Sequence, residues 1–137
     1  MISYSACPEM LELIRKVVEE VEDLSYLKDR VDEIFPVWMD GGKHLNYFAK
    51  IRVISGAWIA LCAYFNCEFK YMLIVNREHF GALNEVGKKR VIEHELRHIP
   101  YDNEKKRLER HNVEDFKEML QKYGLDYVRC AGQEKLI

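Results

Sequence analysis

Apolar residues recur with a helical period near the start of the chain. Pro8 suits the first turn of a helix, where its missing N–H is no loss. Seven apolar residues follow at helical spacing: Met10, Leu13, Ile14, Val17, Val18, Val21 and Leu24. This stripe predicts a long amphipathic helix with one buried face. A second, shorter helical piece carries Leu27, Val31 and Ile34, and Pro36 is expected to end it.

The middle of the chain has the pattern of short strands separated by turns. Gly41 and Gly42 mark a turn, and residues 51–55 alternate in polarity as a strand does. Residues 58–65 are continuously apolar, and their aromatic content favours a strand there as well. The next three residues are interpreted as a hairpin connection into a further apolar strand, residues 69–76.

Two more helices are predicted after these strands. The first begins near Asn84, because asparagine is an effective N-cap residue. Its buried side consists of Val91, Ile92, Leu96 and Ile99. The last helix follows Asn112 and ends at Gly124, a residue type common just beyond helix ends. Its apolar face consists of Val113, Phe116, Leu120 and Tyr123.

The order of these elements predicts one α+β domain over residues 1–137. It has an N-terminal helix, a small and mostly antiparallel sheet, and two helices after the sheet. A chain of this length is large enough to bury a real core.

The first of the two later helices carries His94-Glu95-Leu96-Arg97-His98, which is the pattern H-E-x-x-H. Positions i and i+4 lie above one another on one helix face, so two imidazoles can hold one metal ion. Glu95 lies one step round the helix, beside the position left for water. Two nitrogen ligands and a neighbouring carboxylate base are the core of a zinc hydrolase. A solvated helix with two histidines by chance is the alternative, and the buried side of this helix argues against it.

Catalytic zinc keeps three protein ligands, so a third ligand is expected outside the motif. The extended metzincin pattern is absent, because residues 99–104 contain neither Gly nor His. His111 is the only histidine after His98, and a helix start at Asn112 would leave His111 in the preceding loop. His111 is therefore the expected third ligand, with Glu114 and Asp115 as competing candidates.

Residues 71–124 resemble the phage metallopeptidase family, which is related to the SprT-like zinc peptidases. The resemblance rests on the apolar strand at 71–76, on Phe80, on the motif segment at 91–100 and on His-Asn-Val-Glu-Asp-Phe at 111–116.

The resemblance implies a minimal zincin-like fold and assigns roles to four residues. His94, His98 and His111 match the expected ligands of Zn²⁺, and Glu95 matches the expected general base. Asn112 replaces the Asp that the family usually has, and both residue types cap helices.

The bulk properties fit a small intracellular enzyme. Apolar residues make up 48% and charged residues 32% of the chain, and the formal charge of −2 gives no reason to expect nucleic acid as a partner. Residues 1–10 lack the apolar core of a signal peptide, and no apolar run is long enough for a membrane span. The four cysteines form no C-x-x-C pair, so reduced thiols are expected. The expected location is the cytoplasm, without a membrane partner.

These features predict a zinc-dependent metallopeptidase that acts on a protein or peptide substrate. Glu95 would take a proton from water and deliver it to the leaving amine. Tyr101, Arg97 and Tyr127 are the candidate donors to the oxyanion. The substrate could add as a strand beside residues 71–76. The alternative is a binding or regulatory module in which zinc only stabilises the fold, and Glu95 argues against it because a structural site needs no base.

Overall fold

Strands of both orientations form the centre of the molecule. The computed structural model describes residues 1–67, 69–102 and 108, and every structural statement below concerns these residues. Four strands make one sheet in the order β1-β2-β4-β3. Their bounds are Ser3–Ala6 for β1, Ile34–Asp40 for β2, Ala49–Val53 for β3 and Tyr71–Asn76 for β4.

The sheet is mixed. The β1–β2 and β3–β4 pairs are antiparallel, and the β2–β4 pair is parallel. The expectation of a mostly antiparallel sheet therefore describes two of the three pairs. The expectation that a peptide adds beside residues 71–76 is wrong, because β4 is paired along both sides. Within the described chain, β3 and β1 are the edge strands.

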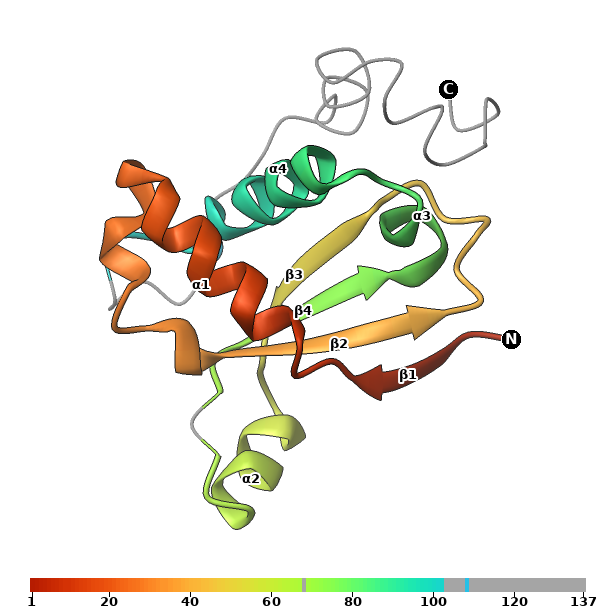
Figure 1. The fold of residues 1–137 in the computed structure, drawn as a ribbon. Coiled ribbons are helices and arrows are strands. Elements are labelled where there is room, and N and C mark those ends of the chain that lie inside the picture. Colours follow the sequence, from red (N-terminus) through yellow and green to blue (C-terminus); the bar gives the residue numbers. More distant parts are fainter. Residues whose placement is uncertain (68, 103–107, 109–137) are drawn as a thin grey trace.

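Two helices cover one face of the sheet (Figure 1). They are α1, Met10–Glu20, and α4, Glu85–Leu96. Ile14 of α1, Leu73 of β4 and Ile92 of α4 are each fully buried in the shared core. Burying a side chain of this size contributes about 1.5–3 kcal/mol to folding. The predicted N-terminal helix and motif helix are confirmed, together with their buried faces.

The segment after α1 differs from the prediction. The α-helix ends at Glu20, and short 3-10 helices follow as η1, Glu22–Leu27, and η2, Val31–Glu33. Pro36 does not end a helix, because it lies inside β2. Its carbonyl accepts a bond from the N–H of Cys7, one residue beyond the last β1–β2 pair, Ala6↔Val37. The missing N–H of Pro36 points to the same side of the strand, where β1 has ended, so no ladder bond is lost.

The strand predicted for residues 58–65 is wrong, because this segment forms helix α2, Ala57–Tyr64. A continuous apolar run does not distinguish strand from helix. Here three alanines and Leu61, which are strong helix formers, outweigh the aromatic residues. Gly56 and Asn66 bracket the helix with positive φ angles of 60° and 56°.

Helix α4 follows a short helix α3, Arg77–Gly81, and is capped as expected. The Asn84 side chain accepts a hydrogen bond of 2.7 Å from the N–H of Gly87. At the other end, the N–H of Arg97 still bonds the carbonyl of Glu93, and that of His98 bonds the carbonyl of Glu95, both at 3.1 Å. His98 therefore belongs to the last turn of this helix, before Pro100 prevents its continuation.

The last predicted helix lies outside the described residues, as do His111, Glu114 and Asp115. No helix in the described part of the chain has the length and apolar character needed to cross a membrane. That residues 1–137 form a single domain stays a prediction.

The Asn84 cap gives a first test of how α4 is held. Asn84→Ala should lower the free energy of unfolding by about 1 kcal/mol, because the first turn of α4 loses its side-chain acceptor. Urea unfolding followed by circular dichroism measures the change. Asn84→Asp should retain most of the stability, since aspartate caps equally well. Equal losses in both variants would contradict a capping role.

Candidate metal site

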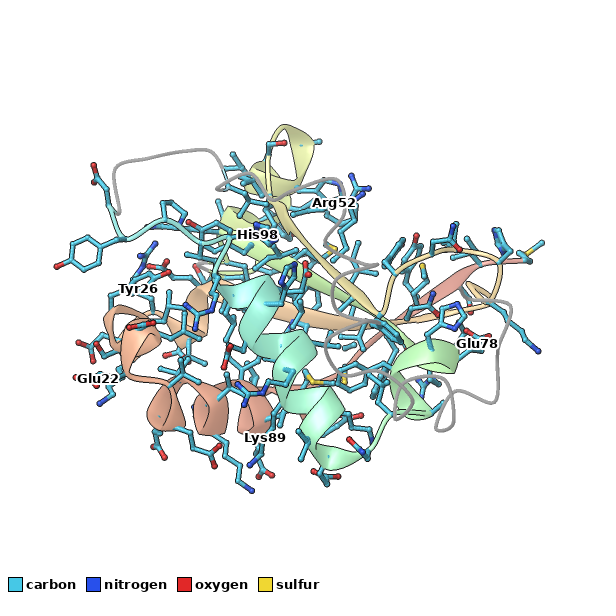
Figure 2. All side chains as sticks on the ribbon, turned by 90° about the horizontal axis from the view of Figure 1, so that it is seen from above. Glu22, Tyr26, Arg52, Glu78, Lys89 and His98 are labelled. Carbon is cyan, nitrogen blue, oxygen red and sulfur yellow. The ribbon has the colours of Figure 1, made fainter. Side chains whose placement is uncertain are left out.

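The last turn of α4 brings three potential metal ligands together. One ligand atom from each of His94, Glu95 and His98 lies within 4.8 Å of the other two. The imidazole rings of His94 and His98 are 5.2 Å apart between centroids and nearly perpendicular, at 85°. Figure 2 shows His98 where the chain leaves this turn. The i, i+4 spacing therefore places both rings on one helix face, as the sequence predicts.

These donors fit a zinc ion. Two nitrogens bound at about 2.1 Å to a tetrahedral ion lie about 3.4 Å apart. The observed ligand atoms lie within 4.8 Å of one another, so rotation of the side chains can bring them to this separation. Glu95 and His98 are buried, while His94 remains partly exposed. The site is thus at the margin of the core, where a bound ion can be reached from solvent.

Glu95 is held by the neighbouring edge strand. Its Oε1 accepts a buried hydrogen bond of 3.1 Å from the backbone N–H of Ile51 on β3. Its Oε2 lies 3.9 Å from Nε2 of His94. A hydrogen bond from a backbone N–H to a carboxylate is stronger than one between neutral groups. One carboxylate oxygen is therefore anchored on the sheet, and the other faces the histidines.

The chain that leaves the motif is fixed by two long-range hydrogen bonds. The hydroxyl of Tyr26 donates to the carbonyl of Ile99 at 2.5 Å, and Nη1 of Arg30 donates to the carbonyl of Pro100 at 3.0 Å. Arg30 also contacts Glu33 and the hydroxyl of Tyr71. Burial raises the pKa of the Tyr71 phenol, so this hydroxyl stays protonated at neutral pH. Residues 26–33 thus set the direction of the chain after His98.

Two of the three candidate oxyanion donors, Arg97 and Tyr101, contact other side chains instead of the metal-binding group. Arg97 pairs with Asp23 at 3.5 Å and with Glu93 at 3.4 Å. Tyr101 is exposed, and its ring packs against Tyr26 with centroids 5.4 Å apart. Tyr127 lies outside the described residues. Arg97 would have to leave its ion pairs to reach a substrate.

The other described histidines lie elsewhere. His79 is fully buried, and its Nε2 is 2.9 Å from the carbonyl of Leu45, so it holds the loop between β2 and β3. His44 is exposed on that loop. Among the described residues, only His94, Glu95 and His98 gather as a possible metal-binding group. His111, the expected third ligand, lies outside the described residues.

None of the described cysteines belongs to this group of possible metal ligands. Cys7, Cys62 and Cys67 are free. Burial is the main cause that raises the pKa of the Cys7 thiol to about 12, so it stays protonated. The expectation of reduced thiols agrees with these three residues.

The sequence predicts the motif but not the groups that hold it in place. The donor to Glu95 is a backbone N–H, which any residue except proline would supply at position 51, so no sequence signal identifies it. Tyr26 and Arg30 act across 73 and 70 positions of sequence. Contacts of that range depend on how α1 and the 3-10 helices pack against α4.

Comparison with known proteins adds the family. A family model described as "Putative phage metallopeptidase" matches residues 2–136. The comparison with curated proteins finds no match, and that with solved structures also finds none. The match extends well beyond the 71–124 stretch in which the sequence shows its clearest resemblance, and includes α1 and the whole sheet. The chain belongs to the phage metallopeptidase family.

Proposed function

We propose that this protein is a zinc-dependent metallopeptidase with a zincin-like arrangement of its site. The observation that carries the proposal is the cluster of His94, Glu95 and His98, with one oxygen of Glu95 fixed by the N–H of Ile51. Family membership supports the metallopeptidase class. The relationship to the SprT-like peptidases stays a prediction, as does the cytoplasmic location.

His94 and His98 are the proposed ligands from α4, and His111 is the proposed third ligand. Three neutral imidazoles are a common donor set for catalytic zinc. Zinc held by them would act as a Lewis acid, which lowers the pKa of a water to about 7 and polarises the scissile carbonyl. Glu95 could serve as a ligand itself, since its Oε2 is near His94. Its hydrogen bond to Ile51 favours the role of base, because that bond holds one oxygen on the sheet.

Glu95 moves the protons of the reaction. Its Oε2 takes a proton from the attacking water and then delivers it to the nitrogen of the leaving amine. The bond from the N–H of Ile51 to Oε1 limits rotation of the carboxylate, so Oε2 stays directed toward the histidines. Such pre-organisation reduces the rearrangement needed as the reaction proceeds.

Strand β3 is the proposed docking edge for an extended peptide. Residues 48 and 54, on either side of β3, form backbone hydrogen bonds with Asn76 and Lys70 at the two ends of β4. Because successive residues of a strand direct their backbone groups to alternate sides, those of residues 49, 51 and 53 point to the outer edge. Glu95 meets this edge at Ile51. Because the N–H of Ile51 already bonds Glu95, a peptide that adds here as a strand would bond the backbone groups of residues 49 and 53 and would present its carbonyls beside the metal ligands.

A zinc-stabilised binding or regulatory module is the second candidate function. It would need a closed site with four protein ligands and would give Glu95 no chemical role. The partly exposed ring of His94 and the anchored Glu95 favour the enzyme.

The first prediction concerns metal content. The protein purified without chelators should contain about one zinc ion per chain. His94→Ala and His98→Ala should each lose it, because each removes one ligand. Elemental analysis by mass spectrometry gives the stoichiometry, and His44→Ala is the control. A metal-free wild type that also takes up no added zinc would refute the proposal.

The second prediction concerns the third ligand. His111→Ala should weaken zinc binding more than about 100-fold, since losing even an outer contact of a ligand costs about 10–100-fold. Competition with a fluorescent chelator measures the affinity. Glu114→Ala and Asp115→Ala are the matched variants, and loss of zinc in either of them with retention in His111→Ala would reassign the ligand.

The third prediction separates a catalyst from a structural site. Glu95→Gln retains an acceptor for the N–H of Ile51 and removes the base. Hydrolysis of an unfolded protein substrate should fall at least about 100-fold, while zinc content and thermal stability change little. Equal cleavage rates in wild type and variant, with zinc present in both, would show that Glu95 is not the base.

A further inference from the structure

Helix α2 is an apolar projection from the sheet. Figure 1 shows it extending away on the side opposite α1 and α4. None of its residues is buried in the structure, and Trp58, Tyr64 and the adjoining Phe65 are 58%, 80% and 67% exposed. No charged residue occurs between Arg52 and Glu68. Large apolar side chains gathered on an exposed element mark an interaction surface.

The apolar side chains surround the axis of α2 completely. At about 100° per residue, Trp58, Ile59 and Tyr64 are separated from one another by about 100–140°. A helix that docks on a protein groove presents one apolar face and leaves the other polar. Because α2 has no polar side, it is most stable where apolar surroundings cover all of its sides. The hydrocarbon region of a lipid leaflet provides such surroundings without a specific pocket.

The segment that carries α2 leaves the sheet after β3 and returns to it at β4. The N–H of Ile59 bonds the carbonyl of Gly56, and the N–H of Cys67 bonds the carbonyl of Cys62. Antiparallel pairing of β3 with β4 holds the two ends of this segment together. At about 1.5 Å per residue, eight residues span about 12 Å, less than half of the roughly 30 Å of a bilayer core. The helix can therefore enter one leaflet without crossing it.

Cations lie at the root of the projection, on the same side of the sheet. The pairs Lys50↔Ile74 and Arg52↔Met72 place Lys50 and Arg52 on the face opposite α1 and α4. Lys70 also lies at the root, where its carbonyl accepts a hydrogen bond from the N–H of Ile54, and its ammonium pairs with Glu33 at 3.4 Å. The strand residues on this face include no Asp or Glu: Tyr4, Ala6, Phe35, Val37, Met39, Lys50, Arg52, Met72, Ile74 and Asn76. This distribution of charge is complementary to anionic lipid headgroups.

We propose that α2 inserts into one leaflet of an anionic lipid bilayer, with Lys50, Arg52 and Lys70 at the level of the headgroups. Trp58 and Tyr64 are of the aromatic types that favour the membrane interface. The sequence predicts no membrane partner, because no segment is long enough to span a membrane. A helix that enters a single leaflet needs no spanning segment. The proposal is independent of the peptidase activity.

Flotation of the full-length protein with lipid vesicles tests the proposal. Wild type should float with vesicles of phosphatidylcholine and phosphatidylglycerol, and more weakly with phosphatidylcholine alone. Ile59→Asp should lower the partition coefficient at least about tenfold, because it puts a charge into the leaflet. Val86→Asp is the matched control, since Val86 is a similarly exposed apolar residue on α4.

The charge contribution has its own variants. Arg52→Gln and Lys70→Gln should each reduce binding to the anionic vesicles about fivefold, and Lys16→Gln on α1 should not. Circular dichroism spectra identical to wild type would exclude misfolding of these surface variants. A wild type that does not float, or flotation that Ile59→Asp leaves unchanged, would overturn the proposal. A dimer in light scattering that Ile59→Asp dissociates, without flotation, would instead assign α2 to contact between copies of the chain.

Discussion

The hydrogen bond from the N–H of Ile51 to the carboxylate of Glu95 joins the two parts of the molecule on which the site depends. It ties the last turn of α4 to the outer edge of β3. A buried carboxylate without a partner would be unstable in the core, and this donor supplies one. The position of the bond also decides which oxygen of Glu95 faces His94. This contact thus sets the direction of the proposed base relative to His94.

Both ends of the motif helix are fixed around this contact. Asn84 caps the beginning, and Tyr26 and Arg30 hold the backbone that follows His98. Metal ligands on a helix fixed at both ends keep their geometry when a substrate binds. The same edge strand that meets Glu95 leads directly into α2, so the proposed peptide edge and the proposed lipid-binding element are consecutive in the chain.

The elements with a clear period and the apolar strand β4 could be predicted from the sequence, whereas β1 and α2 could not. The stripe of α1, the cap of α4 and the H-E-x-x-H spacing each encode their own local structure. β1 is four residues long and exposed, so it has no buried alternation, and α2 has no polar residue to reveal a period. Pro36 is compatible with β2 only because β1 ends beside it, which is a fact of tertiary pairing. The donor that holds Glu95 could not be predicted either, because it is the main-chain N–H of Ile51.

X-ray absorption at the zinc K-edge of the full-length, zinc-loaded protein tests the central claim most directly, namely a three-histidine site with one position left for water. The account predicts a first shell of four nitrogen or oxygen atoms at about 2.0–2.1 Å, with the multiple scattering of three imidazoles. Sulfur scatterers at about 2.3 Å would contradict it, since they would place zinc on the cysteines. A shell of four imidazoles would contradict it as well, because that site would be closed to water.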